Sequence, residues 1–182
     1  MGKSTAAEIL RQRKIAVVDT DDLARQIVQP GQSALAEICQ AFGVHLLDAA
    51  GQLNRAALAA LVFGDAHARG KLEAILHPRI TEIWRQQLCD WRKTGQPLGV
   101  VVIPLLFETK AEAEFDAVIC LACSEPTQRQ RLVARDWSVA QIQQRLAAQM
   151  PISEKMLRSQ FVVWTEGDIE LTAQQLARIF PV

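Results

Sequence analysis

The sequence has no excess of charge of either sign and no long hydrophobic run. Its 182 residues include 20 Lys and Arg and 20 Asp and Glu, so the formal net charge is zero. This balance argues against a protein that holds nucleic acid by bulk electrostatic attraction, although a local basic site for a few phosphates is compatible with it. No apolar segment approaches the roughly 18–20 residues of a membrane-spanning helix, and no signal peptide is evident. We therefore expect a cytoplasmic protein with neither a membrane nor a nucleic-acid partner.

Cysteine is also scarce. The four cysteines, Cys39, Cys89, Cys120 and Cys123, are too few for a disulfide framework. Cys120 and Cys123 form a C-x-x-C pair in an apolar run that predicts a buried strand and its end, whereas redox pairs of this type lie at a helix N-terminus. A zinc site would need a second ligand pair, and the three histidines have no suitable spacing. Buried structural thiols are therefore predicted.

The sequence does contain enough apolar residues, 49%, for a real core, in alternating strand and helix patterns. Short apolar runs predict strands at 15–18, 98–104, 116–121 and 161–164. Helical patterns occur at 5–13, 23–28, 32–42, 54–63, 66–91, 125–135, 139–149 and 169–180. Pro78 is expected to kink or divide the segment 66–91. The alternation predicts an α/β fold in which helices cover both faces of a parallel sheet, with a helical subdomain inserted between strands.

The chain begins with Met1-Gly2-Lys3-Ser4-Thr5, which matches the second half of a phosphate-binding loop. The complete motif is G-x-x-x-x-G-K-[ST] between a strand and a helix. Its amides cradle phosphates, its Lys reaches the β- and γ-phosphates, and its hydroxyl holds Mg²⁺. A helical pattern follows at once, but the first half of the motif and its strand are not in the sequence. The alternative is a polar tail leading into a helix that Ser4 or Thr5 caps.

Carboxylates follow the strand predicted at 15–18. Asp19, Asp21 and Asp22 come where that strand ends, and open α/β sheets bind ligands at the carboxyl ends of their strands. We therefore expect a carboxylate opposite the phosphate loop, where it would position or deprotonate an attacking hydroxyl. The alternative is an Asx turn or an N-cap for the next helix, and one of the three acids is expected to do only that.

Three other features are candidates for binding. Arg131 and Arg135 are four residues apart in a predicted helix and so would share a face, as in a lid that brings guanidinium groups onto phosphates; a solvated face is the alternative. His77 precedes Pro78 on an apolar helix, where a core or capping histidine is the alternative. Glu108 follows a buried strand and would be either a substrate contact or a helix start.

Taken together, these segments resemble the dephospho-CoA kinase family from residue 2 to about 180. The resemblance rests on five blocks in order, GKST, VVDTDDLARQIVQPG, LEAILHPRI, VVIPLLFE and QRQRLVARD. It implies a P-loop kinase fold with three α/β/α layers and a parallel sheet. The implied parts are a core at 1–31, 98–124 and 159–182, a helical substrate subdomain at 32–97, and a lid at 125–158. The implied reaction transfers the γ-phosphate of ATP, with Mg²⁺, to the 3′-hydroxyl of dephospho-CoA, which completes coenzyme A.

The resemblance also implies roles for individual residues. The ATP phosphates would be bound by Gly2, Lys3, Ser4 and Thr5, with Ser4 holding Mg²⁺. Asp21 would be the base for the 3′-hydroxyl, and the other catalytic residues would be Lys3, Arg131 and Arg135. The dephospho-CoA site would be lined by Asp19, Arg25, His77, Leu105, Leu106 and Glu108.

Two departures from the family pattern leave alternatives open. Family members begin with a strand and a Gly-rich turn ahead of the position of Met1, so we expect roughly a dozen further residues in the natural protein. Without them, neighbouring strands would be left unpaired and the 182-residue chain would have little or no activity. Near the adenine site, Trp164 replaces a small polar residue. The alternatives are another P-loop metabolite kinase, or a truncated or degenerate protein that binds CoA-like ligands without catalysis.

Overall fold

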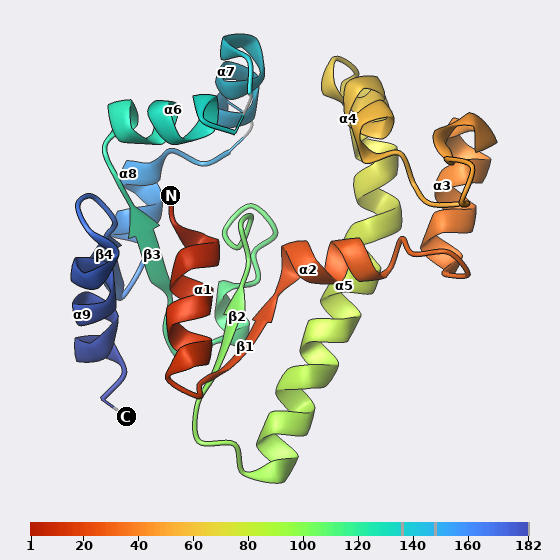
Figure 1. Ribbon diagram of the computed structural model, residues 1–182. Coiled ribbons are helices and arrows are strands. Elements are labelled where there is room, and N and C mark those ends of the chain that lie inside the picture. Colours follow the sequence, from red (N-terminus) through yellow and green to blue (C-terminus); the bar gives the residue numbers. More distant parts are fainter. Residues whose placement is uncertain (136, 148, 182) are drawn as a thin grey trace. The chain divides into compact units, whose positions relative to one another are not determined.

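The computed structural model describes residues 1–135, 137–147 and 149–181 (Figure 1). Contacts divide the chain into two compact units. The first combines Met1–Val17 with Val102–Val182, and we call it the terminal unit; the second, Val18–Val101, we call the helical unit. This division does not test the predicted boundaries of core, substrate subdomain and lid, which stay predictions.

The terminal unit is built around a pair of parallel strands. Strand β3, Ile119–Ala122, pairs with β4, Phe161–Trp164, with Cys120 opposite Val162. Helix α9, Ile169–Ile179, contacts both β4 and helix α1, Lys3–Gln12, whose apolar positions are spaced so that one face is buried. These contacts bring the first and last helices of the chain together, so the half-loop at the start of α1 is held on a packed scaffold.

The remaining helices of this unit follow the two strands. Helix α6, Glu125–Val133, continues from β3, and α7 and α8 cover Val139–Ala147 and Ile152–Leu157. A 3-10 turn lies at Glu112–Glu114. The sequence did not predict α8, which is only six residues long and so carries too short a periodic pattern. The helix expected to extend to 149 includes residue 148, which lies outside the described residues.

Strand β1, Ala16–Asp19, and strand β2, Gly99–Val102, form a second two-stranded sheet. The predicted strands are therefore all present, and the parallel pairing is confirmed between β3 and β4. The described strands make two separate pairs, however, and not one continuous sheet.

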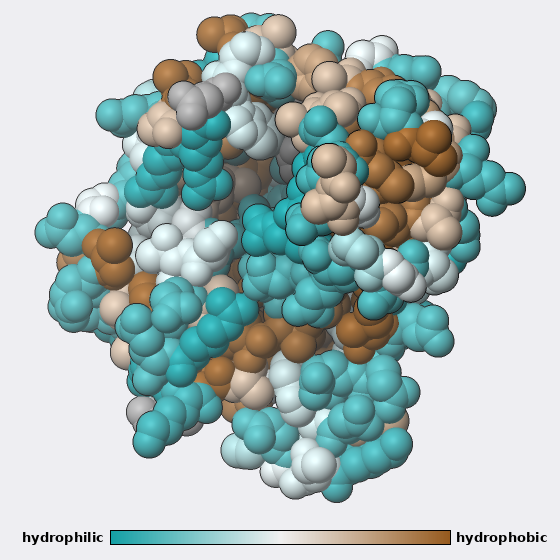
Figure 2. Space-filling view, turned by 45° about the vertical axis from the view of Figure 1, so that its right-hand side comes forward, coloured by the Kyte–Doolittle hydropathy of each residue, from teal (hydrophilic) through white to brown (hydrophobic). Residues whose placement is uncertain are grey.

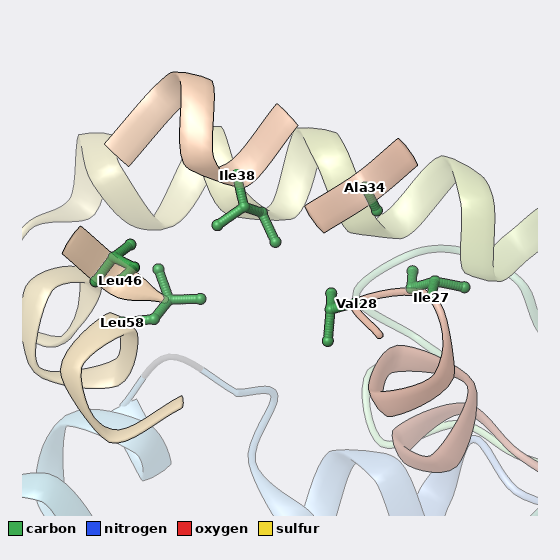
Figure 3. Packing of buried hydrophobic residues seen from close by; sticks show 6 residues of the cluster. All are labelled: Ile27, Val28, Ala34, Ile38, Leu46 and Leu58. Atoms are coloured by element: carbon green, nitrogen blue, oxygen red, sulfur yellow. The ribbon is translucent and has the colours of Figure 1, made fainter. Parts of the chain in front are cut away.

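The helical unit packs its shorter helices on one long helix. Helices α2, Thr20–Gln26, α3, Ser33–Phe42, and α4, Arg55–Phe63, all contact α5, Ala66–Thr94, and a 3-10 turn covers Val44–Leu46. Buried side chains of these elements, and of the residues just after α2, gather in one cluster (Figure 3): Ile27, Val28, Ala34, Ile38, Leu46 and Leu58. Helix α5 contributes Leu72, Ile75, Leu76 and Ile80, whose spacing places them on one face.

Pro78 does not divide α5, which is continuous over 29 residues. A proline inside a helix removes one backbone donor and crowds the carbonyl four residues earlier, here that of Ala74. The apolar face on both sides of Pro78 packs into the cluster of the helical unit, and this packing offsets the lost bond. Among the described helices, none is long and apolar enough to cross a membrane. On the face in Figure 2, hydrophobic groups are interspersed with hydrophilic ones.

Candidate functional site

The half-loop lies at the N-terminus of α1. Gly2 has φ 71°, a left-handed conformation that glycine adopts at little cost, and α1 begins at Lys3. The N-cap position is therefore occupied by Gly2, which has no side chain, and the alternative that Ser4 or Thr5 caps the helix is wrong. Both hydroxyl residues lie in the exposed first turn. The first backbone N–H groups of a helix have no partners within it and attract anions such as phosphate.

Positive charges gather at this helix start. Burial lowers the pKa of the Met1 amine, and Lys3, Arg131 and Arg135 lower it further by repulsion, while Cys123 opposes the shift. Each of these three side chains therefore lies close enough to the Met1 amine to act on it. Cations assembled around a helix N-terminus suit the binding of a polyphosphate.

Arg131 is held in place by one residue of the segment after β4. Its Nη1 donates to the hydroxyl of Thr165 at 3.0 Å, and its Nη2 donates to the carbonyl of Thr165 at 2.6 Å. Helix α6 ends at Val133 and Arg135 lies beyond the C-cap, in an exposed turn. The prediction that Arg131 and Arg135 share a helical face is therefore wrong, because the helix stops before the second arginine.

Glu166 organises the neighbouring corner of the site. Its carboxylate accepts hydrogen bonds from the backbone N–H of Ser124 at 3.0 Å, from the Ser124 hydroxyl, and from the indole N–H of Trp164 at 2.9 Å. The hydrogen bonds from Ser124 and Thr127 lower the pKa of Glu166 to about 2. Trp164, which departs from the family pattern, thus has its polar atom engaged by a carboxylate two residues away. The sequence did not indicate Glu166, since its main partner is 42 residues distant.

The three acids at the end of β1 and the start of α2 have separate environments in the helical unit. Asp19 is buried and caps α2, accepting a bond from the N–H of Asp21 at 2.9 Å, so the capping alternative belongs to this residue. Asp22 forms an ion pair with Arg25, also at 2.9 Å. Asp21 is exposed in the first turn of α2. The substrate roles predicted for Asp19 and Arg25 remain predictions.

His77 is half-buried on α5, and its predicted substrate role also stays a prediction. Its neighbour Arg79 has a clear structural function that the sequence interpretation missed. Arg79 pairs with Glu37 of α3 and donates to the carbonyl of Ile75 at 2.7 Å. The pair joins α3 to α5. Arg79 belongs to the LEAILHPRI block, in which it directly follows Pro78.

Glu108 lies in a turn and starts no helix, so that alternative is wrong. Its Oε1 accepts from Lys155 Nζ at 2.7 Å and from the Met150 N–H at 2.9 Å, and Lys155 also donates to the Pro104 carbonyl at 3.2 Å. Burial raises the pKa of Glu108, but these donors outweigh burial and lower it. Leu105 and Leu106, which precede it, are half-buried. The observed contacts of Glu108 anchor the segment before α8.

The cysteine prediction is confirmed at the C-x-x-C pair. Cys120 and Cys123 are free and buried, and burial raises the pKa of the Cys120 thiol. Cys89 is exposed, and here the prediction of a buried thiol is wrong. No group of three or more His, Cys, Asp or Glu side chains suited to a metal ion occurs in the described part of the chain.

Comparison with known proteins identifies the family. A family model described as dephospho-CoA kinase matches residues 1–170. The "Dephospho-CoA kinase" of Anaeromyxobacter dehalogenans is 44% identical, over 98% of this chain and 85% of that protein, and that of Bdellovibrio bacteriovorus is 39% identical, over 98% and 89%.

Solved structures agree. The structure titled "Crystal structure of TT1252 from Thermus thermophilus" superimposes with a TM-score of 0.79 at 31% identity, covering 99% of this chain and 91% of that one. The dephospho-CoA kinase from Campylobacter jejuni gives a TM-score of 0.71 at 25% identity, covering 99% and 90%. The fold is therefore that of a P-loop kinase, and the chain belongs to the dephospho-CoA kinase family.

Proposed function

We propose that this protein transfers the γ-phosphate of ATP to the 3′-hydroxyl of dephospho-CoA, the reaction that completes coenzyme A. The observation that carries the proposal is the placement of Arg131 at the start of α1: Thr165 holds its guanidinium by two hydrogen bonds and lies against Gly2, next to Lys3. Phosphoryl transfer relies mainly on positioning and on positive charge around the transferring group. In the dephospho-CoA kinase family, the ligand expected for cations at this position is the phosphates of ATP.

Lys3 would contact the transferred phosphates, while Arg131 and Arg135 would neutralise the charge that develops on them. The amides at the start of α1, beside Gly2 and Thr5, would bind further phosphate oxygens. The exposed hydroxyl of Ser4 fits a magnesium ion, since Mg²⁺ takes few protein ligands and completes its shell with water and phosphates. Bound there, the ion would neutralise charge on the β- and γ-phosphates.

Asp21 would accept the proton of the 3′-hydroxyl. The proton leaves as the oxygen attacks the γ-phosphorus and the bond to the β-bridging oxygen breaks, so that ADP carries away the leaving electrons. Among the three acids at the end of β1 and the start of α2, Asp19 is a buried cap and Asp22 is paired with Arg25. Asp21 is the one whose exposed carboxylate is compatible with this task. Arg25, His77, Leu105 and Leu106 would contact dephospho-CoA.

The proposal is tested by measuring ADP release with dephospho-CoA for two proteins. One is the 182-residue chain, and the other is the same chain preceded by a strand and the G-x-x-x-x segment that completes the phosphate loop. We expect little or no release from the first and clear release from the second, because half of the phosphate-cradling amides are supplied by that segment. Equal activity of both would contradict the importance of the half-loop. Binding of dephospho-CoA without turnover by either would favour the alternative of a non-catalytic ligand-binding protein.

The role of Asp21 is tested in the active form. Asp21→Asn should lower kcat by roughly 10²–10⁴-fold, the range for loss of a general base. Asp90→Asn is the matched control, since Asp90 lies on α5 in a loose pair with Lys93 at 3.8 Å. An Asp21→Asn variant with the parent's kcat would remove the proposed role from this residue.

A further inference from the structure

Thr165 lies at the point where three segments of the terminal unit meet. Its hydroxyl donates to the carbonyl of Ala122, at the end of β3, at 3.1 Å, and its N–H donates to the same carbonyl at 2.8 Å. The residue is only 4% exposed. A Cβ built on Gly2 would lie 3.3 Å from the Thr165 methyl carbon, so this methyl group packs directly over the half-loop. The third segment is α6, which reaches Thr165 through Arg131.

The bonds between Arg131 and Thr165 fix the guanidinium plane. Two nitrogens of one planar fork are held by two oxygens of one residue, at 3.0 and 2.6 Å, which is a two-point attachment. The hydroxyl accepts from Arg131 and donates to Ala122, so its proton is committed and its lone pair is directed at the arginine. A guanidinium has five N–H donors, and these two bonds leave three for a ligand.

We propose that Thr165 is the positioning residue for Arg131, holding its guanidinium beside the half-loop so that the remaining donors meet the phosphates of ATP. The inference rests on the proposed function for its ligand. The attachment of Arg131 to Thr165, which we call the tether, depends only on the contacts of Thr165 with Arg131, Ala122 and Gly2. Because an arginine loses side-chain entropy when it binds, holding it in advance should strengthen its contact with the phosphates.

Two substitutions separate the functions of the Thr165 side chain. Thr165→Val keeps its volume and its methyl contact with Gly2 but removes the hydroxyl. The Ala122 carbonyl still has the backbone N–H as a partner, so no buried acceptor is left unpaired. Thr165→Ser keeps the hydroxyl and removes the methyl group. Thr94→Val is a matched control, since the Thr94 hydroxyl bonds only within its own helix, to the carbonyls of Asp90 and Trp91.

The first measurement needs no substrate. In ¹⁵N NMR of arginine side chains, Arg131 of the 182-residue chain should give resolved, slowly exchanging Nη signals, assigned by their loss in Arg131→Lys. These signals should broaden or disappear in Thr165→Val and persist in Thr165→Ser and Thr94→Val. Unchanged Arg131 signals in Thr165→Val would overturn the tether.

The second measurement is a double-mutant cycle on kcat/KM for ATP, in the form that releases ADP. Thr165→Val should lower kcat/KM about tenfold, as expected for a hydrogen bond to a charged group, and Thr165→Ser should lower it less. In an Arg131→Lys background, Thr165→Val should change it less than twofold. Equal losses in both backgrounds would show that Thr165 acts without Arg131 and would overturn the proposal. If no form releases ADP, the proposed function fails while the NMR result still decides the tether.

Discussion

The two units of the chain hold their candidate residues in different ways. In the terminal unit, side chains distant in sequence fix one another: Arg131 bonds to Thr165 across 34 residues, and Glu166 bonds to Ser124 across 42. In the helical unit, the polar bonds around Asp21 are local, spanning two or three residues, and the helices are joined by the apolar cluster and by the pair of Arg79 with Glu37. The first unit therefore depends on polar geometry at its site, and the second depends on packing behind its site.

This difference predicts that substitutions in the two units will lower stability by different amounts and for different reasons. Loss of a buried apolar group in the helical unit should cost stability, because a close-packed cluster cannot fill the void. Loss of one polar partner in the terminal unit should lower the free energy of unfolding less, because the surrounding packing is kept. The remaining partners would lose a hydrogen bond, so the site would be disturbed locally. Substitutions in each unit test the comparison.

The largest stability loss is expected from Ile38→Ala in the helical unit. Ile38 is fully buried among α3, α4 and α5, and Figure 3 shows it facing Leu46 and Leu58 across the cluster. Removing three carbons there should lower the free energy of unfolding by about 3–4 kcal/mol, measured by urea unfolding followed by circular dichroism.

The matched control is Ile83→Ala on α5, whose side chain is 39% exposed. Because much of this side chain is already in water, its loss should cost about 1 kcal/mol or less. Equal losses in Ile38→Ala and Ile83→Ala would contradict the idea that the cluster supplies the stability of the helical unit.

A smaller loss, about 2–3 kcal/mol, is expected from Lys155→Met in the terminal unit. Lys155 is 8% exposed, and its removal leaves the Glu108 carboxylate without its cation and the Pro104 carbonyl without a donor. Breaking one side of a buried pair is costly for this reason. Adding Glu108→Gln should restore part of the lost free energy of unfolding, again measured in urea.

Lys93→Met provides the comparison for this pair. Lys93 is exposed and lies 3.8 Å from Asp90, so its loss should change the free energy of unfolding by less than about 0.5 kcal/mol. If the Lys155 and Lys93 variants were equally stable, the buried pair would have no special part in anchoring the segment before α8.

The same difference between units explains what the sequence could predict. The four strands and the helical stretch were predictable because apolar periodicity is local, and the half-loop was predictable because its motif is contiguous. The contacts of Arg131, Glu108 and Glu166 were not, since each depends on a partner at least 34 residues away. Arg135 was misplaced because a helix end shifts by one or two residues without any strong signal.

Two features of the helical unit also could not be predicted without knowledge of the fold. The sequence indicated that one of the three acids Asp19, Asp21 and Asp22 would cap a helix, but only the geometry identifies Asp19. Pro78 was expected to kink or divide α5, because proline disfavours a helix interior. The helix is not divided, and the packing of the apolar face on both sides offsets that penalty.

The smallest effect, and the one that depends on pH, is expected at Glu166. Its folded pKa of about 2 lies below the ordinary value of 4.5. A depressed carboxylate pKa contributes stability that is present above the unfolded value and is lost as the pH falls toward the folded value. Glu166→Gln should therefore lower Tm at pH 6 by less than Lys155→Met does, and the deficit should narrow as the pH is lowered from about 4.5 toward 2.

Thermal unfolding of Glu166→Gln and the parent between pH 6 and pH 3 checks this, with the exposed Glu82→Gln of α5 as the control at each pH. A deficit that stays constant over this range would mean that the bonds from Ser124 and Trp164 do not favour the ionised form. A narrowing deficit would indicate that one charged carboxylate holds the start of α6 to the end of β4. Since α6, which carries Arg131, begins there, the position of the phosphate-binding end of the site would then depend on the hydrogen bonds of Glu166 too.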